Sequence, residues 1–235
     1  MSSPKTSAIL VAAGNSTRMG GGERKPWRTL RGRPLVWHTL RAFEAAAAVT
    51  EVVLVGHPDD LERLRAFGAG EAVSSKLRAV VPGGAQRTDS VRAGVEACDP
   101  EAQVLLVHDA ARALIEADTI EHAVRTAWTR DAALVAVPVR DTLKRSDAEG
   151  RASETLDREG LWAAQTPQAF RAERLREALA RAAEEGWTPT DDAALYERYF
   201  GAVPIVEGRS SNLKVTCAED LVLAEAILAH REGKQ

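Results

Sequence analysis

The chain has 235 residues, a formal net charge of −3 at pH 7 and a pI of about 6.0. This length suffices for one α/β domain with a large core, and the charge balance excludes a general nucleic-acid-binding surface. No apolar run reaches about 18 residues, which excludes a membrane span, and two widely separated cysteines, Cys98 and Cys217, exclude a disulfide scaffold.

These bounds lead us to expect a single domain over residues 1–235. Residues 1–6 contain no apolar segment typical of a secretion signal, so we expect a cytoplasmic protein that has no membrane or nucleic-acid partner. Both cysteines are then expected to be free thiols in a reducing compartment.

Strand-like and helical segments alternate along the chain, as apolar runs, prolines and capping residues indicate. In chain order we expect a strand at 8–13, a helix at 34–49, a strand at 51–56, a helix at 59–67, a strand at 78–81, a helix at 88–98, a strand at 103–108, a helix at 118–129, a strand at 132–139, helices at 171–185 and 191–200, strands at 202–207 and 213–215, and a helix at 218–230 that a capping box of Thr216 and Glu219 opens. This alternation predicts an α/β fold, a Rossmann-like three-layer sandwich in which helices cover both faces of a mostly parallel, twisted sheet.

Residues 140–165 interrupt the alternation, because they are polar and charged and carry no apolar stripe. From composition alone, a flexible surface loop and an ordered projection are equally open interpretations. Such a segment cannot bury a core by itself, so a partner chain would explain why it is kept ordered.

The first predicted strand leads directly into a glycine-rich loop that contains Arg18, and Lys25 follows that loop. Small residues let backbone N–H groups approach a phosphate chain, and the two side chains add positive charge where phosphates would lie. The spacing matches neither a Walker A loop nor a dinucleotide fingerprint. The pattern favours binding of a nucleoside triphosphate by arginine and lysine, and a plain strand and turn with surface bases is the alternative.

Two further segments, 83–90 and 109–112, also follow predicted strands, as 15–25 does. Ligands of parallel α/β sheets bind at the carboxyl ends of the strands. We therefore expect the three segments to meet at one edge of the sheet.

A series of short motifs runs through the chain from residue 8 to beyond residue 220. In order they are Ala12-Ala13-Gly14…Arg18-Met19-Gly20…Lys25, Gly83-Gly84-x-x-Arg87-x-Asp89-Ser90-Val91, Val107-His108-Asp109-Ala110-Ala111-Arg112, Pro138-Val139-x-Asp141-Thr142-x-Lys144, Asp157-Arg158-x-x-Leu161-Trp162, Thr166-Pro167-Gln168, Thr190-Asp191, Glu207-Gly208 and Asn212-x-Lys214-Val215-Thr216. In these motifs the chain resembles the 2-C-methyl-D-erythritol 4-phosphate cytidylyltransferase family of the sugar-nucleotide transferase superfamily. The resemblance implies the nucleotide-diphospho-sugar transferase type of fold, in which 140–165 is a β-arm that clasps a second subunit in a homodimer with exchanged arms.

The resemblance also implies the reaction. The phosphate of methylerythritol phosphate attacks the α-phosphorus of CTP, and pyrophosphate leaves. A phosphate monoester, with a second pKa of about 6, is largely dianionic near pH 7 and needs no general base. The chemistry instead requires cations, Mg²⁺ and in-line positioning of repelling reactants. His108 is accordingly expected to be structural.

The expected site follows residue by residue from that resemblance. The catalytic candidates are Arg18, Lys25, Arg158 and Lys214. Asp109 is the candidate ligand of Mg²⁺, and the substrate-binding candidates are Ala12, Ala13, Gly14, Gly83, Gly84, Arg87, Ser90, Asp109, Ala110, Arg112, Thr142 and Thr190. Thr142 and Arg158 lie on the expected arm, so they would serve the neighbouring subunit.

The chain departs from the family pattern at three places, namely the dipeptide Pro26-Trp27, Ala85 and Ala113. They affect the expected loop geometry and some CTP contacts. Alternative functions are a cytidylyltransferase for another polyol phosphate such as ribitol 5-phosphate, a guanylyl- or uridylyl-transfer enzyme with the same first loop, and a catalytically inactive nucleotide-binding regulator.

Overall fold

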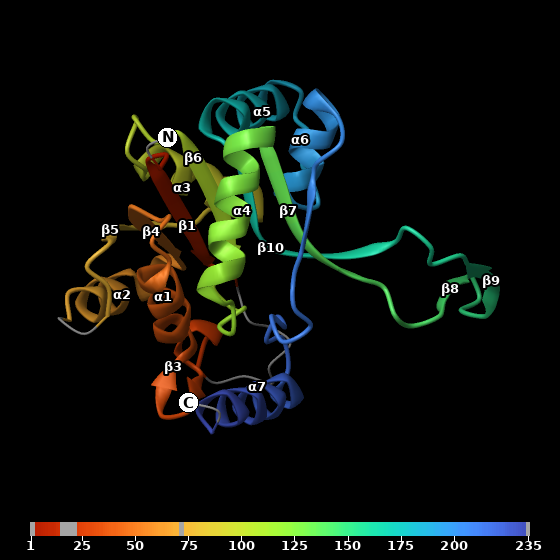
Figure 1. Ribbon diagram of the computed structural model, residues 1–235, viewed down its shortest axis with the longest axis horizontal. Helices are drawn as coiled ribbons and strands as arrows, with labels where there is room; N and C mark the ends of the chain where they lie inside the picture. The colour runs from red at the N-terminus through yellow and green to blue at the C-terminus, as the bar shows by residue number, and fades with distance from the viewer. Residues whose placement is uncertain (1–2, 15–22, 71–72, 234–235) are drawn as a thin grey trace.

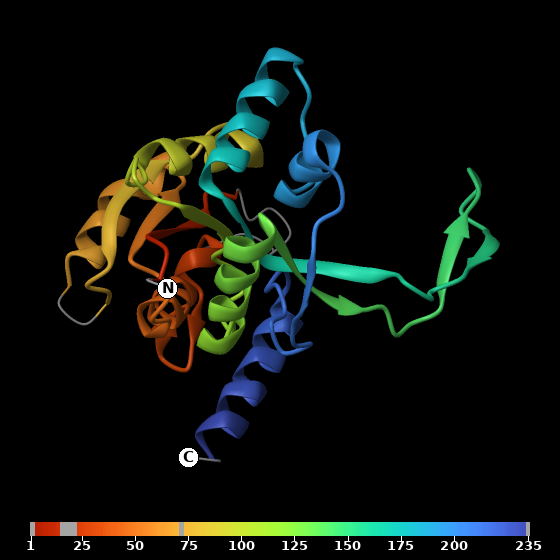
Figure 2. The same ribbon diagram turned by 45° about the horizontal axis from the view of Figure 1, so that its top comes forward.

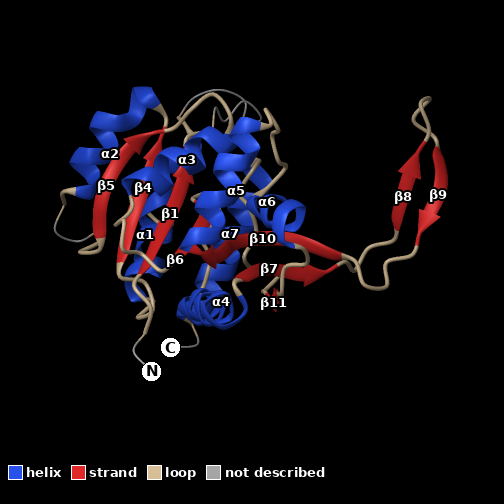
Figure 3. Cartoon of the chain, turned by 90° about the horizontal axis from the view of Figure 1, so that it is seen from above, coloured by secondary structure: helices blue, strands red, loops and turns tan. Residues whose placement is uncertain are grey.

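The structure is a computed structural model that describes residues 3–14, 23–70 and 73–233. Its centre is a twisted seven-stranded sheet with the strand order β11-β7-β10-β6-β1-β4-β5 (Figure 3). The strands are β1 (Thr6–Ala12), β4 (Glu51–Gly56), β5 (Leu77–Pro82), β6 (Val104–Asp109), β7 (Ala132–Pro138), β10 (Trp162–Arg171) and β11 (Ile205–Glu207). Only β10, of these seven, runs antiparallel to its neighbours β6 and β7.

Helices cover both faces of the sheet (Figure 1). They are α1 (Leu35–Ala45), α2 (Leu61–Gly68), α3 (Arg87–Ala97), α4 (Ala117–Arg130), α5 (Ala172–Glu184), α6 (Asp192–Phe200) and α7 (Ala218–Glu232). Neighbouring residues of β1 face opposite layers: Leu10 packs with α1, α2 and α4, whereas Ile9 packs with α3, α5 and α6. This burial on both faces explains the continuous apolar runs of the central strands, and the predicted three-layer α/β fold is confirmed.

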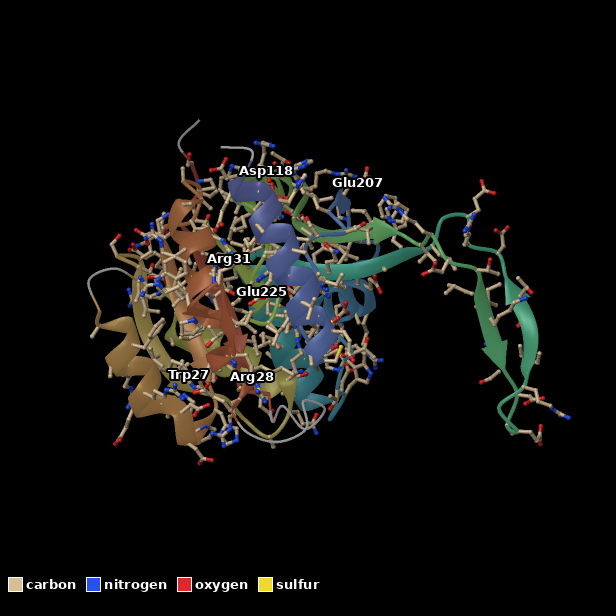
Figure 4. All side chains as sticks on the ribbon, turned by 90° about the horizontal axis from the view of Figure 1, so that it is seen from below. Trp27, Arg28, Arg31, Asp118, Glu207 and Glu225 are labelled. Atoms are coloured by element: carbon tan, nitrogen blue, oxygen red, sulfur yellow. The ribbon has the colours of Figure 1, made fainter. Side chains whose placement is uncertain are left out.

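A third, smaller cluster joins α7 to the strand pair β2 (Thr29–Leu30) and β3 (Arg33–Pro34). Leu30, Leu35 and Ala224 are fully buried in it. Arg31, beside α7 in Figure 4, forms an ion pair with Glu232 at 2.7 Å. The strand pair was not predicted, because two-residue strands carry no periodicity.

Several predictions about individual elements were wrong. β10 was not predicted, and residues 213–215 form no strand, although the Val215 N–H donates to the Ala111 carbonyl at 2.9 Å. The capping box of α7 pairs Cys217 with Asp220 rather than Thr216 with Glu219. The Asp220 carboxylate accepts from the backbone N–H groups of Thr216 and Cys217, and the helix begins at Ala218 as predicted.

Residues 140–164 form the expected projection, whereas Gln165, the last residue of the predicted arm, is buried and donates to the Arg209 carbonyl at 3.0 Å. The hairpin of β8 (Leu143–Ser146) and β9 (Ala152–Leu156) stands clear of the body, joined to β7 and β10 by the connecting segments 139–142 and 157–161 (Figure 2). Its ion pair of Arg145 and Glu154 at 2.7 Å is exposed, and Leu161 and Trp162 at its base are among the most exposed large apolar side chains of the described chain. None of the described helices combines the length and apolarity that a membrane crossing requires.

Candidate functional site

A cleft of about 670 Å³ opens at the carboxyl ends of β1, β4, β5 and β6. Its described lining consists of Val11, Ala12, Ala13, Gly14, Lys25, Pro26, His57, Pro58, Gly83, Gly84, Ala85, Gln86, Arg87, Ser90, Asp109, Ala110, Ala111 and Lys214. Described parts of all three segments expected to meet at one edge of the sheet therefore line one cleft. This is the edge at which parallel α/β sheets bind ligands.

The loop between β5 and α3 packs so closely that glycine is required at two positions. A Cβ at Gly83 would lie 2.3 Å from the Cβ of Ala13, and a Cβ at Gly84 would lie 2.3 Å from the Cβ of Asp89. The Ser90 hydroxyl accepts from the Gly84 N–H at 3.2 Å. The two glycines therefore let the loop pack closely against Ala13 and Asp89. This packing is a second reason for glycine at these positions, beside the expected close approach of a substrate.

Asp109 is the only carboxylate among the described lining residues, and three cations surround it. Lys214 Nζ lies 2.8 Å from Asp109 Oδ2, Arg87 Nε lies 3.6 Å from Oδ1, and Arg112 Nε lies 3.8 Å from Oδ2. Burial alone would raise the pKa of Asp109, but Lys214, Arg87 and Arg112 outweigh burial and hold the pKa below its ordinary value. Asp109 is therefore ionised at neutral pH.

Arg87 is anchored from behind by a buried carboxylate. Its guanidinium lies 2.7 Å from Asp192 Oδ2, and Asp192 is only 1% exposed. Burial would lower the pKa of Arg87, but the charges of Asp192 and Asp109 outweigh it and raise the pKa. A permanently charged guanidinium is thus fixed where the first residue of α3 meets the cleft.

His108 lies beneath Asp109 and is fully buried. Burial lowers the pKa of His108 to about 4, so its imidazole is neutral at pH 7. The Arg112 carbonyl can only accept, so Nε2 donates to it at 3.3 Å, and Nδ1 accepts from the Thr166 hydroxyl at 3.0 Å. The Thr166 oxygen in turn accepts from the Asp109 N–H at 3.0 Å. These bonds fit the structural role expected for His108.

Arg112 braces the segment that carries Lys214. Its guanidinium donates to the carbonyls of Asn212 at 2.9 Å and Ala164 at 3.4 Å. The Asn212 amide, 2% exposed, donates to the Thr166 carbonyl at 2.9 Å. Arg112 is not among the described lining residues of the cleft. Its hydrogen bonds instead tie the segment that carries Lys214 to β10.

Most of the sequence-predicted site residues line the cleft, and several do not. Arg18 lies outside the described residues. Thr142 and Arg158 are exposed on the arm, where the Arg158 guanidinium donates to the Arg140 carbonyl, and Thr190 is exposed before α6. The role of each residue as a substrate ligand stays a prediction.

Sequence reasoning missed His57 and Pro58, which form the wall after β4. The available signal was their place directly after a predicted strand. Two of the departures from the family pattern, Pro26 and Ala85, also line the cleft, whereas Ala113 is buried in the cluster around α7. Lys25, Arg87 and Lys214 against Asp109 leave the described lining with an excess of positive charge, which suits a polyanionic ligand.

Comparisons with known proteins agree with this geometry. The family model described as 2-C-methyl-D-erythritol 4-phosphate cytidylyltransferase matches residues 6–230. A curated relative of that name from Pelotomaculum thermopropionicum is 41% identical, over 98% of this chain and 97% of its own length. A second, from Bacillus velezensis, is 42% identical over 96% of each chain. The crystal structure of 4-diphosphocytidyl-2C-methyl-D-erythritol synthase from Anaerococcus prevotii superposes with a TM-score of 0.84 at 28% identity and covers 97% of each chain. The chain belongs to the 2-C-methyl-D-erythritol 4-phosphate cytidylyltransferase family.

Proposed function

We propose that this chain transfers the cytidylyl group of CTP to 2-C-methyl-D-erythritol 4-phosphate. An oxygen of the acceptor phosphate forms a bond to the α-phosphorus of CTP. The bond from that phosphorus to the oxygen bridging to the β-phosphorus breaks, and pyrophosphate leaves. The product is 4-diphosphocytidyl-2-C-methyl-D-erythritol, an intermediate of isoprenoid biosynthesis. The observation that supports this most is the single cleft in which Lys25, Arg87, Asp109 and Lys214 meet.

The charged residues have distinct proposed roles. Lys25, with Arg18, stabilises the charge that develops on the triphosphate in the transition state. Lys214, whose ammonium group is paired with Asp109 and still partly exposed, orients the acceptor phosphate for in-line attack. Neutral His108 takes no part in proton transfer, because the dianionic acceptor is already a nucleophile.

Asp109 also suits the proposed Mg²⁺. The described residues hold no group of three or more His, Cys, Asp or Glu side chains that could ligate a metal ion. Mg²⁺ often takes one or two carboxylates and completes its shell with substrate phosphates and water, so Asp109 together with the triphosphate fits it. When bound, Mg²⁺ would neutralise phosphate charge.

The proposed enzyme is a cytoplasmic homodimer with exchanged arms. Support comes from Thr142 and Arg158, which are exposed on the projecting arm and absent from the described lining of their own cleft. The exposed apolar side chains Leu161 and Trp162 at the base of the arm would be covered by a second copy. Arg158 of one subunit would then reach the acceptor phosphate of the other.

Release of pyrophosphate tests the proposal. The chain is incubated with Mg²⁺ and CTP plus methylerythritol phosphate, and ribitol 5-phosphate, UTP, GTP and ATP replace the substrates in turn. We expect turnover with the first pair only. Faster turnover with ribitol 5-phosphate would favour the other polyol phosphate, and faster turnover with another nucleotide would favour a different nucleotidyl transfer. Nucleotide binding without turnover of any pair would favour an inactive regulator.

A further inference from the structure

Lys25 reaches the cleft from a very short element. It begins the 3-10 helix η2 (Lys25–Trp27), whose turn is closed by the Trp27 N–H and the Arg24 carbonyl at 3.0 Å. No side chain caps this helix. A single 3-10 turn has little stability of its own, so tertiary contacts must determine where the Lys25 side chain emerges.

Those contacts come from a neighbouring segment, the 3-10 helix η3 (Pro58–Asp60) and α2. The Arg24 guanidinium lies 2.6 Å from Asp59 Oδ2 and 3.1 Å from Asp60 Oδ1. On the other side of Lys25, the buried Trp27 ring lies under the Arg63 guanidinium at 3.9 Å. In Figure 4, Trp27 lies on the side of the body away from the arm.

The two carboxylates that contact Arg24 differ in their surroundings. The Asp59 side chain is 69% exposed, whereas that of Asp60 is 12% exposed. Water and ions screen an exposed pair, so its contribution is small even at a short distance. A largely buried charge interacts more strongly with its partner, so the longer contact to Asp60 is the one that holds Arg24 in place.

Asp60 is itself fixed to the cleft wall. His57 precedes η3, and its Nδ1 accepts from the Asp59 N–H at 3.2 Å, which caps this turn. His57 and Pro58 line the same cleft as Lys25. The pair of Arg24 and Asp60 therefore connects two walls of the cleft that are more than 30 residues apart in sequence.

We propose that Asp60 is a positioning residue for Lys25. Acting through Arg24, its buried carboxylate fixes the turn that presents the Lys25 ammonium group to the cleft. The inference rests on the proposed function of Lys25 in stabilising the transition state. Asp60 belongs to none of the family motifs and is not among the described lining residues.

A double-mutant cycle tests this coupling. Turnover of CTP with methylerythritol phosphate is measured for wild type, Asp60→Asn, Lys25→Gln and the double variant, with Asp59→Asn as the matched control on the same guanidinium. Misplacement of a catalytic group by about 1 Å costs up to about 100-fold in rate. We expect Asp60→Asn to lower kcat about tenfold with the KM for CTP changed less than about twofold, and Asp59→Asn to stay within about twofold of wild type.

The decisive comparison is in the Lys25→Gln background, where Asp60→Asn should cost less than about twofold because the group it positions is gone. An equal loss in both backgrounds would overturn the proposal, as would equal effects of Asp60→Asn and Asp59→Asn. Should Asp60→Asn fail to fold, Arg24→Gln takes its place in the same cycle.

A measurement without turnover separates this inference from the proposed function. Amide hydrogen exchange of the peptide spanning residues 23–30 should be faster in Asp60→Asn than in wild type and unchanged in Asp59→Asn. Inactive wild type with this exchange pattern would refute the proposed function and leave the anchoring of the turn intact. Unchanged exchange in Asp60→Asn would refute the anchoring whatever the activity.

Discussion

The buried imidazole of His108 should make the protein less stable in mild acid. Its pKa is about 4 in the folded chain against an ordinary value of 6.5. Between these values the unfolded chain binds a proton that the folded chain excludes, so folding stability falls as pH falls through this window. The folding stability that depends on a neutral His108 imidazole is therefore fully present above pH 6.5. Protonation would place a hydrogen on Nδ1, which accepts from the Thr166 hydroxyl, so that hydroxyl would lose its acceptor and have to turn its own hydrogen away.

The magnitude follows from the two pKa values. One pKa unit corresponds to about 1.4 kcal/mol, so lowering the pH from about 7.5 to about 5 should remove about 2 kcal/mol of unfolding free energy through His108. Urea unfolding of wild type and His108→Gln at both pH values measures this, because the carboxyl groups titrate alike in the two proteins and cancel. His122→Gln, exposed on α4, is the control. An identical pH-dependent loss in wild type and His108→Gln would refute the reasoning.

Three further predictions concern the cleft and its support. Lys214→Ala should lower kcat by about 10²–10³ through loss of a cation at the reacting phosphates, and near-normal turnover would contradict its role. Gly83→Ala should lower the unfolding free energy by about 1–3 kcal/mol, because its Cβ would lie 2.3 Å from that of Ala13; an unchanged Tm would count against this contact. Arg87→Met should cost about 3–5 kcal/mol in urea unfolding by leaving the buried Asp192 carboxylate without its partner, and combining it with Asp192→Leu should recover most of the loss. Equal losses in the single and double variants would speak against a buried ion pair.

The central strands and the glycine loop could be predicted because their causes are local. All six residues of β4 are buried, and residues 52–55 form a continuous apolar run between Glu51 and Gly56, the bounds that the sequence indicated. The turn after β5 contains Gly83 and Gly84, and parallel strands bring their carboxyl ends to one edge. Local pattern and topology together therefore located the cleft without any knowledge of side-chain contacts.

β10 could not be predicted because its sequence combines two environments. Its first three residues, from Trp162, are exposed on the arm, and the following six are buried between β6 and β7. Pro167 removes a hydrogen-bond donor within the strand, and the register with β7 shifts between Ala164 and Gln168. Neither a period of two nor a long apolar run survives, so the segment reads as a loop.

The contacts of the buried polar groups beneath the cleft are the part of the site that no motif reveals. Asp192 is buried behind Arg87, and Arg112 spends its donors on the Asn212 and Ala164 carbonyls. Each contacts a motif residue that lies far away in the sequence. The local sequence therefore gives no indication of its partner.

Their arrangement has a physical reason in the charges that they hold. Lys25, Arg87 and Lys214 repel one another, and Asp109 alone among the described lining residues offsets them. A flexible side chain would relax away from this repulsion and would have to be reordered when phosphates bind, which weakens transition-state stabilisation. Buried partners remove that freedom in advance, and a buried polar network is stable only when its donors and acceptors are paired. The precision of the cleft therefore depends on residues that need not contact a substrate.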